Sequence, residues 1–272
     1  MSLVETDWLE KNINSVKIID CSWHMPQTKR NGLKEYKNQH IPNSIFFDLD
    51  ANSRKEINLP HMLVNQNDWE QIVSKMGIKN EDEIVIYDNS DVISSCRCWF
   101  NFIYFGHNPK LVHVLNGGLK KWIKENRKTT NSISNVQLSK YKCFEKKELI
   151  KNKKLIDQNI DEQKFKVIDA RSKERFGGKI AEPRKGLRSG SIKNSFCLPF
   201  LNLINNDGTF VSKSKIFEKF KSIECDLDKN LVFSCGSGVT AAVLAFAYSL
   251  INKNYMPIIY DGSWSEYGRY PI

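Results

Sequence analysis

The chain has 272 residues, of which 40% are hydrophobic and 26% are charged, and its formal net charge is +10. This length allows two domains of ordinary size, each with its own hydrophobic core. The lysines are spread along the chain without a dense basic run interleaved with aromatic residues, so we expect no nucleic-acid partner. The densest basic run, residues 146–154, is interpreted as the solvated face of a helix.

Short apolar runs alternate with helical stretches along the chain. In chain order, strands are predicted at residues 16–20, 83–88, 165–169 and 230–235, and helices at residues 68–76, 214–223 and 241–251. Continuous apolar strands between helices are typical of a parallel sheet that is covered on both faces. The sequence therefore predicts an α/β fold.

The same pattern occurs twice, with a period of roughly 145–150 residues. Residues 16–20 match 165–169, residues 40–45 match 191–196, residues 83–88 match 230–235, and residues 115–122 match 260–267. Four matches in one order are hard to obtain by chance. We predict an N-terminal domain at residues 1–124, a polar linker at 125–142 and a C-terminal domain at 143–272.

The cysteines, the N-terminus and the apolar stretches indicate the cellular setting. The seven cysteines are scattered, with no CxxC pair and no Cys/His spacing typical of zinc, so we expect free thiols, a reducing cytoplasm and no metal. The N-terminus carries acids and no apolar segment, so we expect no signal peptide. The longest apolar stretch, residues 241–251, is too short to cross a bilayer, and we expect a buried helix and no membrane partner.

The strand that ends at Cys235 leads into a glycine-rich turn and an apolar helix. This arrangement would hold a thiolate among backbone N–H groups at the positive end of a helix, a setting that favours the ionised form of a cysteine. Cys235 is therefore a candidate nucleophile, and the alternative is a buried structural cysteine. At the equivalent position the first copy has Asp88 and no glycine-rich turn, so only the second copy is predicted to be catalytic.

The duplicated unit, the loop Cys-Gly-Ser-Gly-Val-Thr at residues 235–240 and the segment Asp-Gly-Ser-Trp-Ser-Glu at residues 261–266 resemble the two-domain rhodanese superfamily. The resemblance implies two tandem rhodanese-like domains, each a parallel sheet with helices on both faces, of which the N-terminal copy is inactive. It also implies an enzyme that transfers sulfur through a persulfide on Cys235 and needs no cofactor. The loop residues implied to bind the substrate are Gly236, Gly238, Val239 and Thr240.

The residues around the loop bear on the substrate. Gly236 and Ser237 are uncharged where thiosulfate-using members of the family carry basic side chains, which favours 3-mercaptopyruvate, whose carboxylate lies away from its sulfur. Arg175 and Arg184 resemble the family's arginines that bind the substrate carboxylate and keto oxygen, and arginine pairs a carboxylate through two parallel bonds. The alternatives are a thiosulfate:cyanide sulfurtransferase and, for the two arginines, a solvated surface pair.

The resemblance also implies proton-transfer groups and an acceptor. Ser237 and Asp50 are implied as an acid–base pair assisted by His61, although Asp50 can equally be a cap or turn residue and His61 a structural histidine. The implied sulfur acceptor is cyanide, a small thiol or a reduced thioredoxin-like protein.

The sequence bears on three other functions. A cysteine phosphatase needs an arginine six residues after its cysteine, and Ala241 stands there. Residues 236–241 fit the dinucleotide-binding pattern G-x-G-x-x-A, but too few residues follow Asp261 to complete such a sheet. A non-enzymatic sulfur-carrier or adaptor module stays open, although the intact loop and both arginines argue against it.

Overall fold

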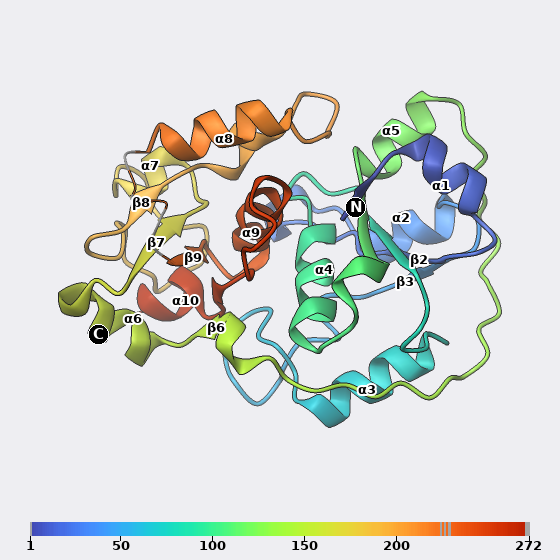
Figure 1. The fold of residues 1–272 in the computed structure, drawn as a ribbon, viewed down its shortest axis with the longest axis horizontal. Helices are drawn as coiled ribbons and strands as arrows, with labels where there is room; N and C mark the ends of the chain where they lie inside the picture. Colours follow the sequence, from blue (N-terminus) through green and yellow to red (C-terminus); the bar gives the residue numbers. More distant parts are fainter. Residues whose placement is uncertain (1, 224, 226, 228–229, 270–272) are drawn as a thin grey trace. The chain divides into compact units, whose positions relative to one another are not determined.

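The computed structural model describes residues 2–223, 225, 227 and 230–269 (Figure 1). The chain divides into two compact units. Unit 1 comprises Met1–Arg54, Leu63–Lys146 and Asn206–Phe210, and unit 2 comprises Lys55–Met62, Lys147–Asn205 and Val211–Ile272. A short segment from each half of the sequence therefore belongs to the other half's unit.

Unit 1 contains a five-stranded parallel sheet with the strand order β1-β5-β4-β2-β3. Its strands are β1 (Leu3–Val4), β2 (Lys17–Asp20), β3 (Ser44–Phe46), β4 (Ile84–Tyr87) and β5 (Val112–Leu115). Its helices are α1 (Thr6–Asn12), α2 (Gly32–Asn38), α3 (Gln66–Lys75), α4 (Ser95–Tyr104) and α5 (Gly118–Lys124), with 3-10 turns η1 (Pro26–Thr28) and η2 (Pro109–Leu111). Every residue of β4 and β5 is buried, as expected for central strands covered on both faces.

Unit 2 repeats this architecture strand for strand, in the order β6-β10-β9-β7-β8. Its strands are β6 (Ile150–Lys151), β7 (Phe165–Asp169), β8 (Phe196–Cys197), β9 (Asn230–Ser234) and β10 (Ile259–Tyr260). Its helices are α6 (Lys153–Glu162), α7 (Lys173–Phe176), α8 (Lys213–Lys221), α9 (Val239–Ile251) and α10 (Ser263–Tyr267), with 3-10 turns η3 (Lys147–Leu149) and η4 (Phe200–Leu203). The predicted α/β fold and duplication are confirmed.

Each unit has its own apolar core. In unit 1, Trp69 of α3 stacks on Phe105 with ring centroids 4.7 Å apart and meets Phe102 edge-on. In unit 2, α9 is buried along most of its length because its residues are apolar all round. Among the described residues no helix is both long and apolar enough to cross a membrane.

The prediction that residues 146–154 form the solvated face of a helix is wrong. This basic run forms η3 and β6, and α6 begins only at Lys153. The reason is tertiary: Ile150 and Lys151 pair with Ile259 and Tyr260 of β10 as an edge strand, which is too short to show a periodic pattern.

The predicted polar linker lies in a segment that forms neither helix nor strand. Residues 125–146, all of them described, run along unit 1. Thr130 makes an isolated bridge with His40, and the Ser139 N–H donates to the Ser74 carbonyl at 3.0 Å.

Candidate active site

Cys235 lies at the point where β9 turns into α9. The N–H groups of Ser237 and Gly238 point at its sulfur, with N···Sγ distances of 3.4 and 3.1 Å. Gly238 makes this turn possible because its φ is 79°, a left-handed conformation that glycine adopts without strain. The sulfur therefore sits at the N-terminus of a 13-residue helix, where backbone N–H groups and the helix dipole favour an anion.

The other side of this loop is held by α10, which follows β10. The N–H of Trp264 donates to the Cys235 carbonyl at 2.9 Å, and the N–H of Ser265 donates to the Gly236 carbonyl at 2.8 Å. The Ser263 hydroxyl accepts the N–H of Cys235 at 3.1 Å. These bonds turn the loop carbonyls toward α10 and leave the following N–H groups facing the sulfur.

Two arginines lie beside the loop. A Cβ atom at Gly236 would be 3.1 Å from Nη2 of Arg175 and 3.7 Å from Nη1 of Arg184, so glycine leaves the room that both guanidinium groups occupy. Arg184 also donates from Nη2 to the Ser237 hydroxyl at 3.3 Å. The structure thus brings Arg175, Arg184, Gly236 and Ser237 together, with both guanidinium groups beside the loop, where their N–H groups can bind an anionic ligand.

Arg175 is held in place by Glu182, whose side chain is 2% exposed. Nε and Nη2 of Arg175 donate to the two carboxylate oxygens at 3.1 and 2.6 Å. Glu182 also accepts from Nη1 of Arg171 at 2.8 Å, and Arg171 in turn binds Asp169 at the end of β7. Burial lowers the pKa of Arg171, but Asp169 and Glu182 outweigh this and raise it, so the guanidinium stays charged. A row of four alternating charges therefore runs from the sheet to Arg175.

This row rests on Trp264. The guanidinium carbon of Arg171 lies 4.4 Å from the Trp264 ring centroid, and that of Arg188 lies 4.6 Å from it. The same tryptophan donates from Nε1 to the Arg188 carbonyl at 2.8 Å. Because the Trp264 backbone also binds the Cys235 carbonyl, one residue links the arginines to the loop.

His61 belongs to unit 2, although it lies in the N-terminal half of the sequence. It is 3% exposed, and its Nδ1 lies 3.0 Å from the Ser237 hydroxyl and 3.3 Å from the Ser237 carbonyl. The bond from Arg184 uses a lone pair of the Ser237 oxygen and leaves the hydroxyl proton available. Ser237 can therefore donate this proton to Nδ1 of His61, or accept a proton from Nδ1 when that nitrogen is protonated. A pair that can pass a proton in this way suits acid–base chemistry.

Asp50, Val239 and Thr240 are the other residues that the sequence predicts for the site. Asp50 lies in unit 1, is exposed, and accepts the indole N–H of Trp23 at 2.9 Å. Val239 and Thr240 form the first turn of α9. The acid–base role of Asp50 and the substrate-binding roles of Val239 and Thr240 stay predictions.

The equivalent position in unit 1 is filled by a carboxylate. Asp88 follows β4 and accepts the N–H groups of Ser90 and Ser95, both at 2.8 Å. Burial raises the pKa of Asp88. Its side chain thus takes the place that the sulfur has in unit 2, so this copy has no thiol at the end of β4, and the loop N–H groups of Ser90 and Ser95 are already engaged.

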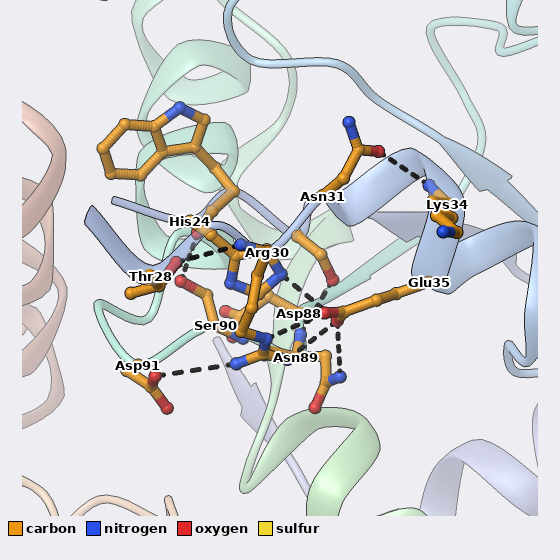
Figure 2. A network of polar contacts seen from close by, with 12 residues as sticks. His24, Thr28, Arg30, Asn31, Lys34, Glu35, Asp88, Asn89, Ser90 and Asp91 are labelled. Atoms are coloured by element: carbon orange, nitrogen blue, oxygen red, sulfur yellow. Dashed lines mark hydrogen bonds and ion pairs between the residues drawn. The ribbon is translucent and has the colours of Figure 1, made fainter. Parts of the chain in front are cut away.

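Asp88 belongs to a polar network of unit 1 in which Arg30 makes several contacts (Figure 2). Arg30 binds Glu35 through Nε and Nη2 at 2.8 and 2.7 Å, and it donates to the Asn89 carbonyl at 3.0 Å. Arg30 also lies 3.5 Å from Asp91. The charge of Arg30 is therefore balanced within unit 1.

Sequence reasoning missed four residues of the site: Asp169, Arg171, Glu182 and Ser263. A signal existed for Glu182, which stands two residues before Arg184 and is an acid in a basic stretch. None existed for Ser263, whose contact with Cys235 depends on the approach of two loops. Within the described parts of the chain, no cluster of three or more His, Cys, Asp or Glu could hold a metal ion.

Comparisons with known proteins agree with this geometry. A family model described as a rhodanese-like domain matches residues 5–125 and 152–269. The Arabidopsis thaliana protein named thiosulfate/3-mercaptopyruvate sulfurtransferase 1, mitochondrial, is 36% identical, and the match covers 99% of this chain and 76% of that protein. The mouse protein named 3-mercaptopyruvate sulfurtransferase is 34% identical, with 98% and 91% covered. The crystal structure of SseA from Escherichia coli, described as a 3-mercaptopyruvate sulfotransferase, superposes with a TM-score of 0.87 at 29% identity, covering 98% of this chain and 100% of that one.

Proposed function

The chain belongs to the rhodanese-like family and is a sulfurtransferase, and on that premise we propose that it moves the sulfur of 3-mercaptopyruvate onto Cys235. The observation that carries this proposal is the position of Cys235 Sγ against the N–H groups of Ser237 and Gly238, with two guanidinium groups beside the loop. These N–H groups stabilise the attacking thiolate and then the persulfide that replaces it.

The Cys235 thiolate attacks the thiol sulfur of the donor, an S–S bond forms, and the C–S bond breaks with its electron pair going to carbon. The product carbon leaves as pyruvate enolate. The proton of the donor thiol reaches the enolate through Ser237 and His61, whose side chains are 3.0 Å apart, so that pyruvate is released and Cys235 keeps a persulfide anion.

Substrate binding falls to Arg175 and Arg184. Glu182 takes the Nε–H and one N–H of Nη2 of Arg175. Nη2 lies beside Gly236, so its second N–H is placed to bind the substrate carboxylate or keto oxygen. The uncharged Gly236 and Ser237 favour this mono-carboxylate donor over the thiosulfate dianion, which is the second candidate donor because the name of the Arabidopsis relative includes it.

Mass spectrometry tests the proposal. Incubation with 3-mercaptopyruvate is expected to add about 32 daltons, the mass of one sulfur, to the peptide that carries Cys235. Cys235→Ser should abolish both the mass gain and pyruvate release. Cys197→Ser, which removes a half-buried thiol from the same unit, should leave both unchanged. Pyruvate release by Cys235→Ser at the wild-type rate would refute the proposal. If the wild-type enzyme has a higher kcat/KM with thiosulfate than with 3-mercaptopyruvate, thiosulfate is its sulfur donor instead.

Two further parts of the proposal concern the sulfur acceptor and the cellular compartment. We propose cyanide, a small thiol or a reduced thioredoxin-like protein as acceptor, to be compared by the rate at which each removes sulfur from the loaded enzyme. A cytoplasmic location is proposed from the free cysteines, against an Arabidopsis relative whose name places that protein in mitochondria. Fluorescence microscopy of a tagged chain would decide it.

A further inference from the structure

Ser263 adopts a backbone conformation that serine rarely adopts. Its φ is 47°, in the left-handed region, and the residue is fully buried. Such a residue is less stable there than glycine, because its Cβ approaches the backbone. Strained conformations of this kind persist where the surrounding structure requires them, and they concentrate at functional sites.

Unit 1 provides an internal comparison. The N–H of Leu119 donates to the Asp88 carbonyl at 2.9 Å, as the N–H of Trp264 donates to the Cys235 carbonyl at 2.9 Å. The residue before Leu119 is Gly118, with φ 54°, so Gly118 and Ser263 are structurally equivalent. The copy without the cysteine has glycine at this left-handed position, and the copy with the cysteine has serine.

The hydroxyl of Ser263 supplies what glycine lacks. It donates its one proton to the Tyr260 carbonyl at 2.8 Å, and it accepts the N–H of Cys235 at 3.1 Å. The bond to Tyr260 fixes the hydroxyl, and the fixed oxygen then fixes the peptide group from which the Cys235 side chain projects. Removal of the hydroxyl would leave that N–H buried without its partner.

We propose that Ser263 is a positioning residue for the nucleophile: through the N–H of Cys235 it aims the sulfur at the N–H groups of Ser237 and Gly238. This inference rests on the proposed role of Cys235 as the residue that takes up sulfur. Because a reacting atom displaced by about 1 Å can react about 100-fold more slowly, loss of this bond should slow sulfur uptake.

Ser263→Gly is the sharpest variant, because it places in unit 2 the residue that unit 1 has and relieves the left-handed strain. Ser195→Ala is the matched control. Ser195 lies in the same unit but outside the site, and its hydroxyl donates to the carbonyl three residues earlier, that of Ile192, as the Ser263 hydroxyl does to Tyr260. Stopped-flow mixing with 3-mercaptopyruvate gives the rate constant of sulfur uptake and the amount of sulfur taken up per chain.

For Ser263→Gly we expect a rate constant reduced about 10-fold or more, with close to one sulfur per chain and a Tm no lower than that of the wild type. Ser195→Ala should keep the wild-type rate constant. A wild-type rate constant in Ser263→Gly overturns the inference, as does a lower sulfur content per chain at unchanged rate, which would mean that Ser263 only supports folding.

Alkylation separates this inference from the proposed function. Alkylation of Cys235 by iodoacetamide, followed by mass spectrometry on the peptide that carries this residue, does not require sulfur transfer. It should be several-fold slower in Ser263→Gly because the sulfur has left the N–H groups that stabilise its anion. If the wild type takes up no sulfur, the proposed function fails. If both proteins are alkylated at the same rate, the positioning role of Ser263 fails.

Discussion

Replacement of Glu182 by glutamine tests whether the row of buried charges holds Arg175 in place. Glutamine keeps the shape and one acceptor oxygen but removes the charge that faces Arg171 and Arg175. Removing one partner of a buried ion pair costs about 3–5 kcal/mol, and because the amide still accepts one bond we expect about 3 kcal/mol. For a domain of this size, that loss lowers Tm by roughly 10 °C.

The same substitution has two opposing effects on substrate binding. It adds net positive charge near the site, which attracts an anion, but salt screens this attraction over about 8 Å. It also releases the Arg175 guanidinium from the plane in which Glu182 holds it, and lost orientation of a bidentate group costs about 1.4 kcal/mol or more. The second effect is larger, so we expect kcat/KM for 3-mercaptopyruvate to fall about 10-fold.

Thermal unfolding and steady-state pyruvate release measure both effects of Glu182→Gln. Glu174→Gln is the matched control, because it removes the same charge from an exposed position in α7. The bonds of Arg171 and Arg175 described above go to Glu182 and Asp169 and do not involve Glu174. Glu174→Gln should change neither Tm nor kcat/KM. If Glu182→Gln unfolds at the wild-type temperature with wild-type kcat/KM, the row of charges does not position Arg175.

Two further predictions concern pH and proton transfer. Burial raises the pKa of Asp20 to about 6, partly offset by its bonds with Ser22, so the native state binds this proton more tightly than the unfolded chain does. The stability that it contributes is present at low pH and is lost as pH rises through about 6; between pH 4 and 7 urea unfolding should show the wild type losing about 2.4 kcal/mol relative to Asp20→Asn. A constant difference between the two proteins would contradict this. His61→Asn, chosen because asparagine tolerates the φ of 60° found here, should lower kcat about 100-fold with little change in KM. Unchanged kcat would remove His61 from the proton path.

The strands, the duplication and the nucleophile loop were predictable because each is a local pattern. Continuous apolar runs identify β2, β4, β7 and β9, and the glycines after Cys235 identify a turn that brings backbone N–H groups to a side chain. The resemblance of residues 235–240 to a known family added the chemistry.

What the sequence did not predict depends on contacts between distant segments. β6 has only two residues and forms because β10 pairs with it. The lysines on either side of it therefore led to the prediction of a solvated helix face. The position of His61 in unit 2 depends on residues 55–62 packing there. The pairing of Glu182 with Arg171 and Arg175 likewise requires a folded loop, since 7 and 11 residues separate the partners in sequence.

The two copies show that one backbone arrangement can be completed in two ways. In both units the residue that follows the strand, Asp88 or Cys235, accepts the N–H of the residue two positions later. In both units an arginine that precedes X-Gly-Leu in sequence also donates to this loop: Arg30 in unit 1 and Arg184 in unit 2. In unit 1 the strand-end side chain is a carboxylate that occupies the N–H groups itself. Glu35 and Asp91 also balance the charge of Arg30. A single change of Asp88 to cysteine would thus supply a thiol at the strand end without the serine that binds the N–H of Cys235 in unit 2, because unit 1 has Gly118 there. The catalytic copy differs in the residue at the left-handed position as well as in its nucleophile, so more than one substitution separates the two units.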